Sequence, residues 1–188
     1  LGKLWLLLPL PGDAAGRVNL LSAVLSAATV GLLYLLARRI GLATAPSLLA
    51  SLTLTFSQTF RSQAVRAEVY ALNSLFVVAL LALAVACAER DGAGRVPSLL
   101  LALGFSLAHH RMTLLLAPAL ALLAWPALQA LWQADRRRHV LVGLAALMLP
   151  LLLYLYIPLR GPETPYMRLA VGGGPELVLY ENTPADVW

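Results

Sequence analysis

The chain alternates long apolar runs with short polar connections. Six runs lie at residues 18–37, 40–60, 69–88, 96–109, 112–132 and 140–157. An α-helix needs about 20 apolar residues to cross the hydrocarbon core of a bilayer. The first three runs meet this requirement without a charged residue, and run 140–157 is just long enough although it contains Pro150. The pattern therefore predicts transmembrane helices.

The run 96–109 is too short for a full crossing, since its 14 residues extend only about 21 Å as a helix. His110 and Arg111 alone separate it from run 112–132. It is either a half-depth helix or one part of a long broken span. Helices broken within a membrane need a cavity that is wet or lined by protein.

The last thirty residues have a different character. Residues 159–188 contain several Gly and Pro pairs that are typical of loops, and only 176–180 indicates a short strand. We therefore expect residues 1–158 to form a transmembrane helical bundle and residues 159–188 to form an extramembrane loop. Residues before 18 read as the end of an earlier helix or an elbow, so we expect the sequence to be an internal piece of a longer protein.

Composition supports this assignment. Apolar residues make up 60% of the 188 residues and charged residues 12%, and the mean hydropathy is +0.79. A soluble domain of this size has too little interior for so much apolar surface, and disorder requires low hydrophobicity and high charge. The lone Cys87 excludes a disulfide framework and a cysteine zinc site. The fold class predicted is an all-α polytopic transmembrane helix bundle.

The formal charge of +5 does not indicate nucleic-acid binding, because the basic residues are scattered among the connections. If 96–109 and 112–132 cross and return, each side of the membrane holds seven of the 14 basic residues, so the positive-inside rule cannot orient the chain. The compact cluster Arg136-Arg137-Arg138 favours the cytoplasm for its side. The dispersed arginines of the other side then need a different explanation.

The connection around residues 60–73 is the first candidate for chemistry. In a helix, Arg66, Tyr70 and Asn73 would share one face, and Arg61 and Glu68 lie nearby in sequence. One interpretation is structural: the arginines contact lipid headgroups, Glu68 makes an ion pair and Tyr70 lies in an aromatic belt. The other is an anion site, because the planar guanidinium group donates paired hydrogen bonds to phosphate.

His109-His110-Arg111 is the second candidate. Three consecutive polar residues between apolar runs must face a cavity, the membrane interface or protein. They form an interfacial turn without chemistry or a contact to phosphate or substrate. A metal site is the least favoured alternative, because the third histidine, His139, follows the arginine cluster on the opposite side. We expect no bound metal.

Five strings together suggest a family. They are Leu1-Gly2-Lys3-Leu4-Trp5, Arg17-Val18-Asn19-Leu20-Leu21-Ser22, Ala67-Glu68-Val69-Tyr70-Ala71-Leu72-Asn73, Ala108-His109-His110-Arg111 and Tyr154-Leu155-Tyr156-Ile157-Pro158-Leu159-Arg160. In this order the chain resembles a widespread bacterial multipass family that is similar to the animal transmembrane protein O-mannosyltransferases, of the GT-C glycosyltransferase class. The acidic motif that is essential in that family is not present, and we expect it to precede Leu1.

The resemblance implies a membrane glycosyltransferase in the bacterial cytoplasmic (inner) membrane. Such an enzyme transfers a sugar, here expected to be mannose-like, from a polyprenyl-phosphate donor to a protein hydroxyl at the outer face. No cofactor is implied beyond that lipid-linked donor, and the partners expected are the bilayer, the donor and a protein acceptor. Glu68 would be an acceptor-orienting or structural carboxylate rather than the main base, so the piece alone is expected to be inactive. The residues expected to bind substrate are Arg61, Arg66, Tyr70, Asn73, His109, His110, Arg111 and Arg160.

Two alternatives come from the residues themselves. A multipass transporter would line its substrate path with the same broken helix and buried polar groups. A non-catalytic membrane scaffold would tolerate replacement of Arg66, Glu68 and Arg111.

Overall fold

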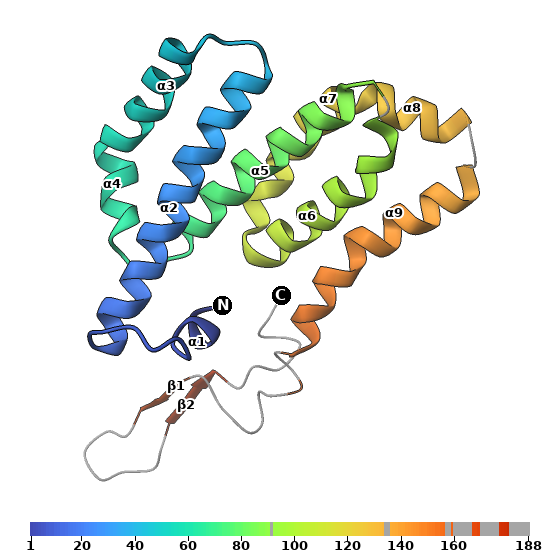
Figure 1. Ribbon diagram of the computed structural model, residues 1–188. Helices are drawn as coiled ribbons and strands as arrows, with labels where there is room; N and C mark the ends of the chain where they lie inside the picture. The colour runs from blue at the N-terminus through green and yellow to red at the C-terminus, as the bar shows by residue number, and fades with distance from the viewer. Residues whose placement is uncertain (91, 134–135, 157–158, 160–166, 170–176, 181–188) are drawn as a thin grey trace.

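The computed structural model describes residues 1–90, 92–133, 136–156, 159, 167–169 and 177–180. Within these ranges the protein is a bundle of α-helices with one small hairpin (Figure 1), which confirms the all-α polytopic class. The elements are α1 (Gly2–Trp5), α2 (Ala14–Arg39), α3 (Thr44–Phe56), α4 (Gln58–Ala64), α5 (Tyr70–Ala88), η1 (Gly92–Arg95), α6 (Val96–His109), η2 (Arg111–Leu116), α7 (Ala117–Leu123), α8 (Trp125–Gln133), α9 (Arg136–Leu151), η3 (Leu152–Leu155), β1 (Met167–Leu169) and β2 (Leu177–Tyr180).

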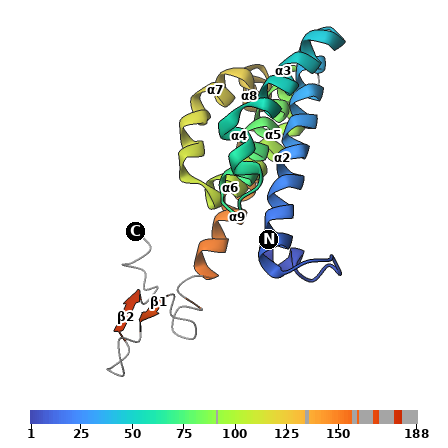
Figure 2. The same cartoon turned by 90° about the vertical axis from the view of Figure 1, so that its left-hand side faces the viewer.

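Helix α5 lies at the centre of the bundle. It packs against α2 on one side and α6 on the other, and α6 packs in turn against α9 (Figure 1). Seen from the α3–α4 side, those two helices stand in front of α5 and α6 (Figure 2). The buried core is made largely of small and medium side chains, which let the helices approach closely. It comprises Leu80, Ala84, Cys87, Val96, Leu99, Leu120, Ala124 and Ala127.

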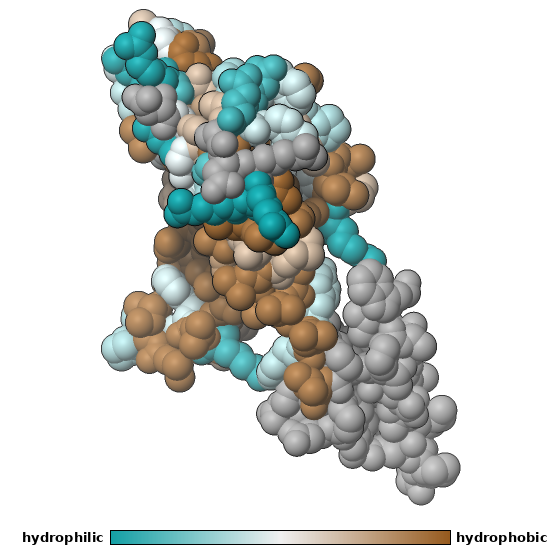
Figure 3. Space-filling view, turned by 90° about the vertical axis from the view of Figure 1, so that its right-hand side faces the viewer, coloured by the Kyte–Doolittle hydropathy of each residue, from teal (hydrophilic) through white to brown (hydrophobic). Residues whose placement is uncertain are grey.

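Three helices of the described chain are long and apolar enough to cross a membrane: Ala14–Arg39, Tyr70–Ala88 and Arg137–Leu155. The apolar side chains of α9 lie largely on the outside, where Leu141 and Leu149 are each 62% exposed, whereas those of α5 are largely covered by neighbouring helices. Figure 3 shows hydrophobic side chains gathered across the middle of one face and hydrophilic ones above them. A surface of this kind is stable against lipid rather than water, so the protein is membrane-associated.

Run 40–60 does not form one continuous helix. A turn at Gly41, with φ of +94°, precedes α3, and α3 is only 13 residues long. It ends at Ser57, whose ψ of 127° leaves the helical region before α4 begins. Within α3 the hydroxyls of Ser47 and Ser51 donate to the carbonyls four residues earlier, at 2.8 and 3.0 Å. These bonds satisfy the polar side chains inside an apolar helix.

Run 112–132 is also broken. The helical segments Arg111–Leu123 and Trp125–Gln133 meet at an angle of 67°. Pro126 follows the bend as the second residue of α8. Proline has no backbone N–H to continue the hydrogen bonding of the preceding helix, so the chain begins a new helix there. The buried hydroxyls of Ser106 and Thr113, 2.8 Å apart, connect α6 to the start of this returning segment.

Helices α6 and α9 run side by side in the same direction. Gly104 makes their close approach possible, because a Cβ atom there would lie 2.4 Å from the Leu147 carbonyl oxygen and 3.0 Å from Cγ of Pro150. Closer to the start of both helices, a Cβ on Gly143 would lie 2.9 Å from Cδ1 of Leu100. The predicted span 140–157 therefore packs closely against α6 at two positions, one at Gly104 and one at Gly143.

An ion-pair cluster joins α2, α5 and η1 at one end of the bundle. Arg39 donates to both carboxylate oxygens of Glu89, at 2.6 and 2.7 Å. Arg95 donates to Glu89 at 3.0 Å and to the Ala86 carbonyl at 2.6 Å. The hydrogen bond from Arg39, with the positive charges of both arginines, lowers the pKa of Glu89 to about 2. Glu89 therefore stays ionised at neutral pH.

Only part of the predicted C-terminal loop lies within the described residues. Strand β2 (Leu177–Tyr180) falls within the short strand predicted at 176–180, and it pairs antiparallel with β1. Most other positions from 160 onward lie outside the described residues.

Candidate functional site

The two candidate constellations meet at the end of the bundle opposite Glu89. Helix α4 ends at Ala64, α5 begins at Tyr70, and the five residues between them form a bent connection. In this connection the Glu68 amide donates to the Arg66 carbonyl at 2.9 Å. Because residues 65–69 are not helical, Arg66 does not extend the helical face that carries Tyr70 and Asn73. Those two residues keep their three-residue spacing on α5.

His109 ties this connection to the end of α6. Its Nε2 lies 2.9 Å from the carbonyl oxygen of Val69, 40 residues earlier in the chain. A carbonyl only accepts, so Nε2 must carry the proton, and Nδ1 of the neutral ring is left as an acceptor. The imidazole also packs at a tilt against Phe76, with ring centroids 6.1 Å apart. This hydrogen bond joins the two candidate constellations directly.

A pocket of about 230 Å³ lies between this connection, helix α2 and the first residues of the chain. Its polar lining side chains are Ser22, Glu68 and His109. Ser22 is a buried position on α2, only 4% exposed. The remaining lining is apolar or glycine: Leu1, Gly2, Val18, Leu21, Leu25, Ala67, Val69 and Leu72. A carboxylate, a hydroxyl and an imidazole are thus placed around one hollow, where they can hydrogen-bond to the hydroxyl groups of a small polar ligand.

Tyr70, Asn73 and His110 form the neighbouring part of the site. The rings of Tyr70 and His110 have centroids 6.3 Å apart at an angle of 48°. His110 has an extended backbone between α6 and η2. Its Nδ1 and the Oδ1 of Asn73 are buried and have no hydrogen-bond partner among the residues described. Buried polar atoms are normally paired, so these two atoms are available to a bound ligand or water.

The predicted arginines are not part of the pocket wall. Arg61, Arg66 and Arg111 are exposed, and none of them lines the pocket. Arg160 lies outside the described residues. The structure thus brings Glu68 and His109 to one hollow and Tyr70 beside His110, and it leaves the three described arginines on the surface at the same end.

Sequence reasoning missed Ser22 and Arg17. Arg17 donates through its guanidinium group to the carbonyls of Leu6 and Leu8, and Trp5 Nε1 donates to the Arg17 carbonyl at 2.7 Å. These bonds fold the first residues, which include part of the pocket wall, against α2. A signal was present, because a cation in the first turn of a helix is unfavourable beside the helix dipole and indicates a compensating partner.

A comparison with known protein families finds a match. Residues 1–130 match the model described as the protein O-mannosyl-transferase TMEM260 N-terminal domain. Neither a curated protein nor a solved structure matches the chain. The family match covers every residue that lines the pocket and both constellations, whereas Arg160 lies beyond it. Because it spans 130 of the 188 residues, the chain belongs to the family of the protein O-mannosyl-transferase TMEM260 N-terminal domain.

Proposed function

We propose that this chain is part of a GT-C membrane glycosyltransferase. The enzyme takes a mannose-like sugar from a polyprenyl-phosphate donor and transfers it to a protein hydroxyl at the outer face of a bacterial inner membrane. The observation that carries the proposal is the pocket lined by Ser22, Glu68 and His109, which lies wholly within the part of the chain that matches an O-mannosyltransferase family.

Glu68 accepts a hydrogen bond from the acceptor hydroxyl or from a sugar hydroxyl in this proposal. A carboxylate is the strongest acceptor that the pocket offers. His109 acts as a positioning residue, because it holds the carbonyl of Val69 directly after Glu68. The unpaired atoms of Asn73 and His110 accept from further hydroxyl groups. Tyr70 contributes the aromatic surface on which a sugar ring packs.

The arginines bind the donor phosphate. Arg61, Arg66 and Arg111 are exposed at the same end of the bundle as the pocket, and an arginine at the membrane boundary can reach a lipid phosphate without crossing the hydrocarbon region. Arg160 is assigned the same role from its place in the sequence. The donor lipid would thus lie beside the bundle, with its phosphate at the surface and its sugar turned toward Glu68.

Transfer of labelled mannose from polyprenyl phosphate tests the proposal, with the full-length protein that contains this chain in membrane vesicles. We expect Glu68→Gln to lower kcat with little change in the apparent KM for the donor. Arg66→Gln and Arg111→Gln should raise that KM by about tenfold, because each removes a charged hydrogen-bond donor worth roughly 1.5 kcal/mol. Arg90→Gln removes an equal charge outside the site and serves as the matched control. Unchanged donor KM in both site variants would remove the phosphate assignment.

The bend between α7 and α8 favours a second candidate, a transporter, because broken helices often line substrate paths in transporters. Uptake of labelled substrate into vesicles, with no sugar transfer by any preparation, would support that alternative.

A further inference from the structure

A second cavity lies away from the candidate site, at the Arg137 end of the bundle. This groove is enclosed by α6, α8 and α9 and has a volume of about 370 Å³, which is within the range of small-ligand sites. Apart from His139 and the indole nitrogen of Trp132, its lining is apolar. The lining residues are Val96, Leu100, Leu128, Leu131, Trp132, His139, Val140, Gly143, Leu144 and Leu147.

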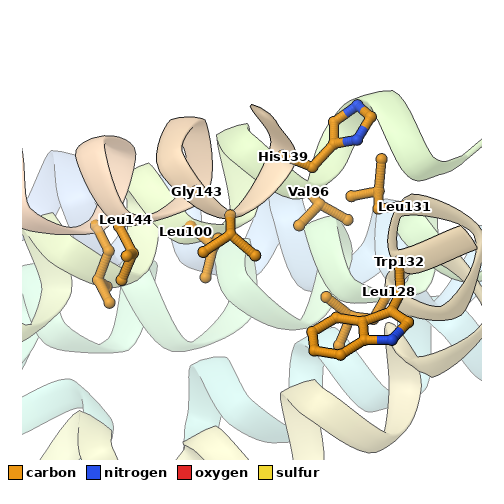
Figure 4. Close-up of a pocket in the computed structure, with 10 residues that line it drawn as sticks. Val96, Leu100, Leu128, Leu131, Trp132, His139, Gly143 and Leu144 are labelled. Carbon is orange, nitrogen blue, oxygen red and sulfur yellow. The ribbon is translucent and has the colours of Figure 1, made fainter. Parts of the chain in front are cut away.

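The groove has a polar end and an apolar end. Figure 4 shows His139 at the same end as Leu131 and Trp132, whereas Leu144 lies at the opposite end. From His139 to Leu147 the groove follows α9 for eight residues, or about 12 Å. Half of a 30 Å hydrocarbon core is about 15 Å, so the groove covers most of the depth of one leaflet. Its length suits a ligand that enters from that leaflet.

Positive charge is concentrated at the polar end. Arg136, Arg137 and Arg138 directly precede His139, and Asp135 is the one acidic residue beside them in the sequence. This segment therefore carries a net charge of at least +2. Arg95 directly precedes Val96, at the start of α6, and belongs to a cluster in which two arginines share the single carboxylate of Glu89. Anionic headgroups accumulate beside such basic segments.

The floor of the groove is formed where α9 and α6 approach closely. Gly143 lines it, and a Cβ atom there would meet Cδ1 of Leu100 at 2.9 Å. The absence of a side chain at this position lets Leu100 of α6 lie directly against the backbone of α9. Nδ1 of His139 is buried and has no hydrogen-bond partner among the described residues. Because buried polar atoms are normally paired, this nitrogen is available for a hydrogen bond to a headgroup.

We propose that the groove binds one anionic phospholipid from the leaflet at the Arg137 end. One acyl chain lies between α8 and α9 over Gly143, and the headgroup phosphate lies beside Arg137 and His139. Charge and shape both support this occupant, since a neutral lipid brings no net negative charge to Arg137 and a free phosphate leaves the apolar groove unfilled. The site is separate from the proposed transferase pocket and does not depend on it.

Fluorescence quenching by brominated lipids tests this directly. The chain is reconstituted in vesicles with Trp132 as its one tryptophan, after replacement of Trp5, Trp125 and Trp188 by Phe. One set of vesicles contains phosphatidylglycerol with brominated acyl chains in unlabelled phosphatidylcholine, and the other has the label on phosphatidylcholine. We expect the relative association constant from Trp132 quenching to be at least fivefold higher for phosphatidylglycerol.

Three variants locate the site. Arg137→Gln should reduce the preference for phosphatidylglycerol by about fivefold, the change expected when one arginine is removed from an anionic membrane surface. Gly143→Leu adds bulk in the groove and should reduce quenching by both lipids, and Leu144→Phe, one residue further along α9, adds bulk without a second tryptophan if the glycine variant does not fold. Lys3→Gln, with an equal loss of charge at the opposite end of the bundle, should leave the preference unchanged.

A chain that retains Trp125 in place of Trp132 is the control for lipids at the general surface, because Trp125 is exposed and does not line the groove. Equal quenching of Trp132 by the two lipids would overturn the proposal. Absence of quenching by either lipid would also overturn it, and would indicate that protein covers the groove. Inorganic phosphate at equal concentration should not displace the lipid; displacement would show that the headgroup alone is bound.

Discussion

His109 and Val69 are joined by a hydrogen bond of 2.9 Å between the imidazole Nε2 and the backbone carbonyl oxygen. The same carbonyl accepts from the Asn73 amide at 3.1 Å, in the first turn of α5. A single oxygen therefore links the end of α6 to the beginning of α5, directly beside Glu68. The position of the Glu68 carboxylate depends on this link, because residues 65–69 have no helical hydrogen bonding of their own.

Replacing His109 should loosen the connection between α4 and α5. His109→Ala removes one hydrogen bond, worth about 1 kcal/mol, so the open connection should be about five times more populated. Limited trypsin digestion at the exposed Arg66, followed by mass spectrometry, measures this opening. His109→Gln retains a side-chain donor and should fall between wild type and alanine. His139→Ala, at the other end of the bundle, is the control, and equal cleavage of all four proteins would show that the bond does not restrain the connection.

Stability should depend on pH through Glu89. Its pKa is about 2 in the folded protein against an ordinary value of 4.5. Above pH 4.5 the carboxylate is ionised in both states and its ion pairs stabilise the fold fully. As pH falls from 4.5 toward 2 the unfolded chain binds the proton first, so this contribution is lost. Glu89→Gln should lower the Tm at pH 7 and show a smaller fall in Tm between pH 5 and pH 3.

The matched variant Arg90→Gln should keep the wild-type pH profile. Because the side chains of Arg39 and Glu89 are each about 40% exposed, high salt should weaken the effect by screening. A Glu89→Gln profile parallel to that of wild type would contradict the assignment.

Alanine at Gly104 should destabilise the contact between α6 and α9. The new methyl group would lie 2.4 Å from the Leu147 carbonyl oxygen, which belongs to a helix backbone and cannot rotate away. Overpacking of this kind costs about 1–3 kcal/mol. Gly31→Ala is the matched control on α2, where a Cβ meets nothing within 4 Å, and it should stabilise the helix by roughly 0.5–1 kcal/mol. Unfolding in mixed detergent micelles gives both values, and opposite signs are the expected result.

The Ser106 and Thr113 hydroxyls should be energetically coupled. Ser106 is fully buried and Thr113 is 4% exposed. Ser106→Ala leaves the Thr113 hydroxyl without this partner, at a cost of about 1–3 kcal/mol, and Thr113→Val does the reverse. The double variant should cost less than the sum of the two single variants. Strict additivity in unfolding measurements would show that the two hydroxyls do not depend on each other.

The predictions that succeeded depend on length and polarity alone. The uncharged runs around α2 and α5 are long enough to span, and both form single helices. The break at Ser57 was not predicted, because the length of an apolar run does not show where the backbone leaves the helical conformation. The 67° bend before Pro126 carried a signal in the proline, but a proline can begin a helix as readily as it ends one.

The candidate site was only partly accessible from sequence. Glu68 and His109 were identified as separate candidates by their polarity in apolar surroundings, and both line the same pocket. Ser22 was missed because serine is common on transmembrane helices and the sequence does not show what this one faces. The partnership of Arg39 with Glu89 spans 50 residues, and such a pairing depends on how whole helices pack.

Helix α5 is anchored unequally at its two ends. Among the described residues, two guanidinium groups hold the Glu89 end through four hydrogen bonds to carboxylate and carbonyl oxygens, whereas at the other end the imidazole of His109 bonds to the carbonyl of Val69. We therefore expect the bundle to open more readily beside Glu68 than at the Glu89 end. A bulky ligand that enters at Glu68 can be accommodated by a small rotation of α5 about its Glu89 end. The ion pairs that hold the helices in register there would not be broken.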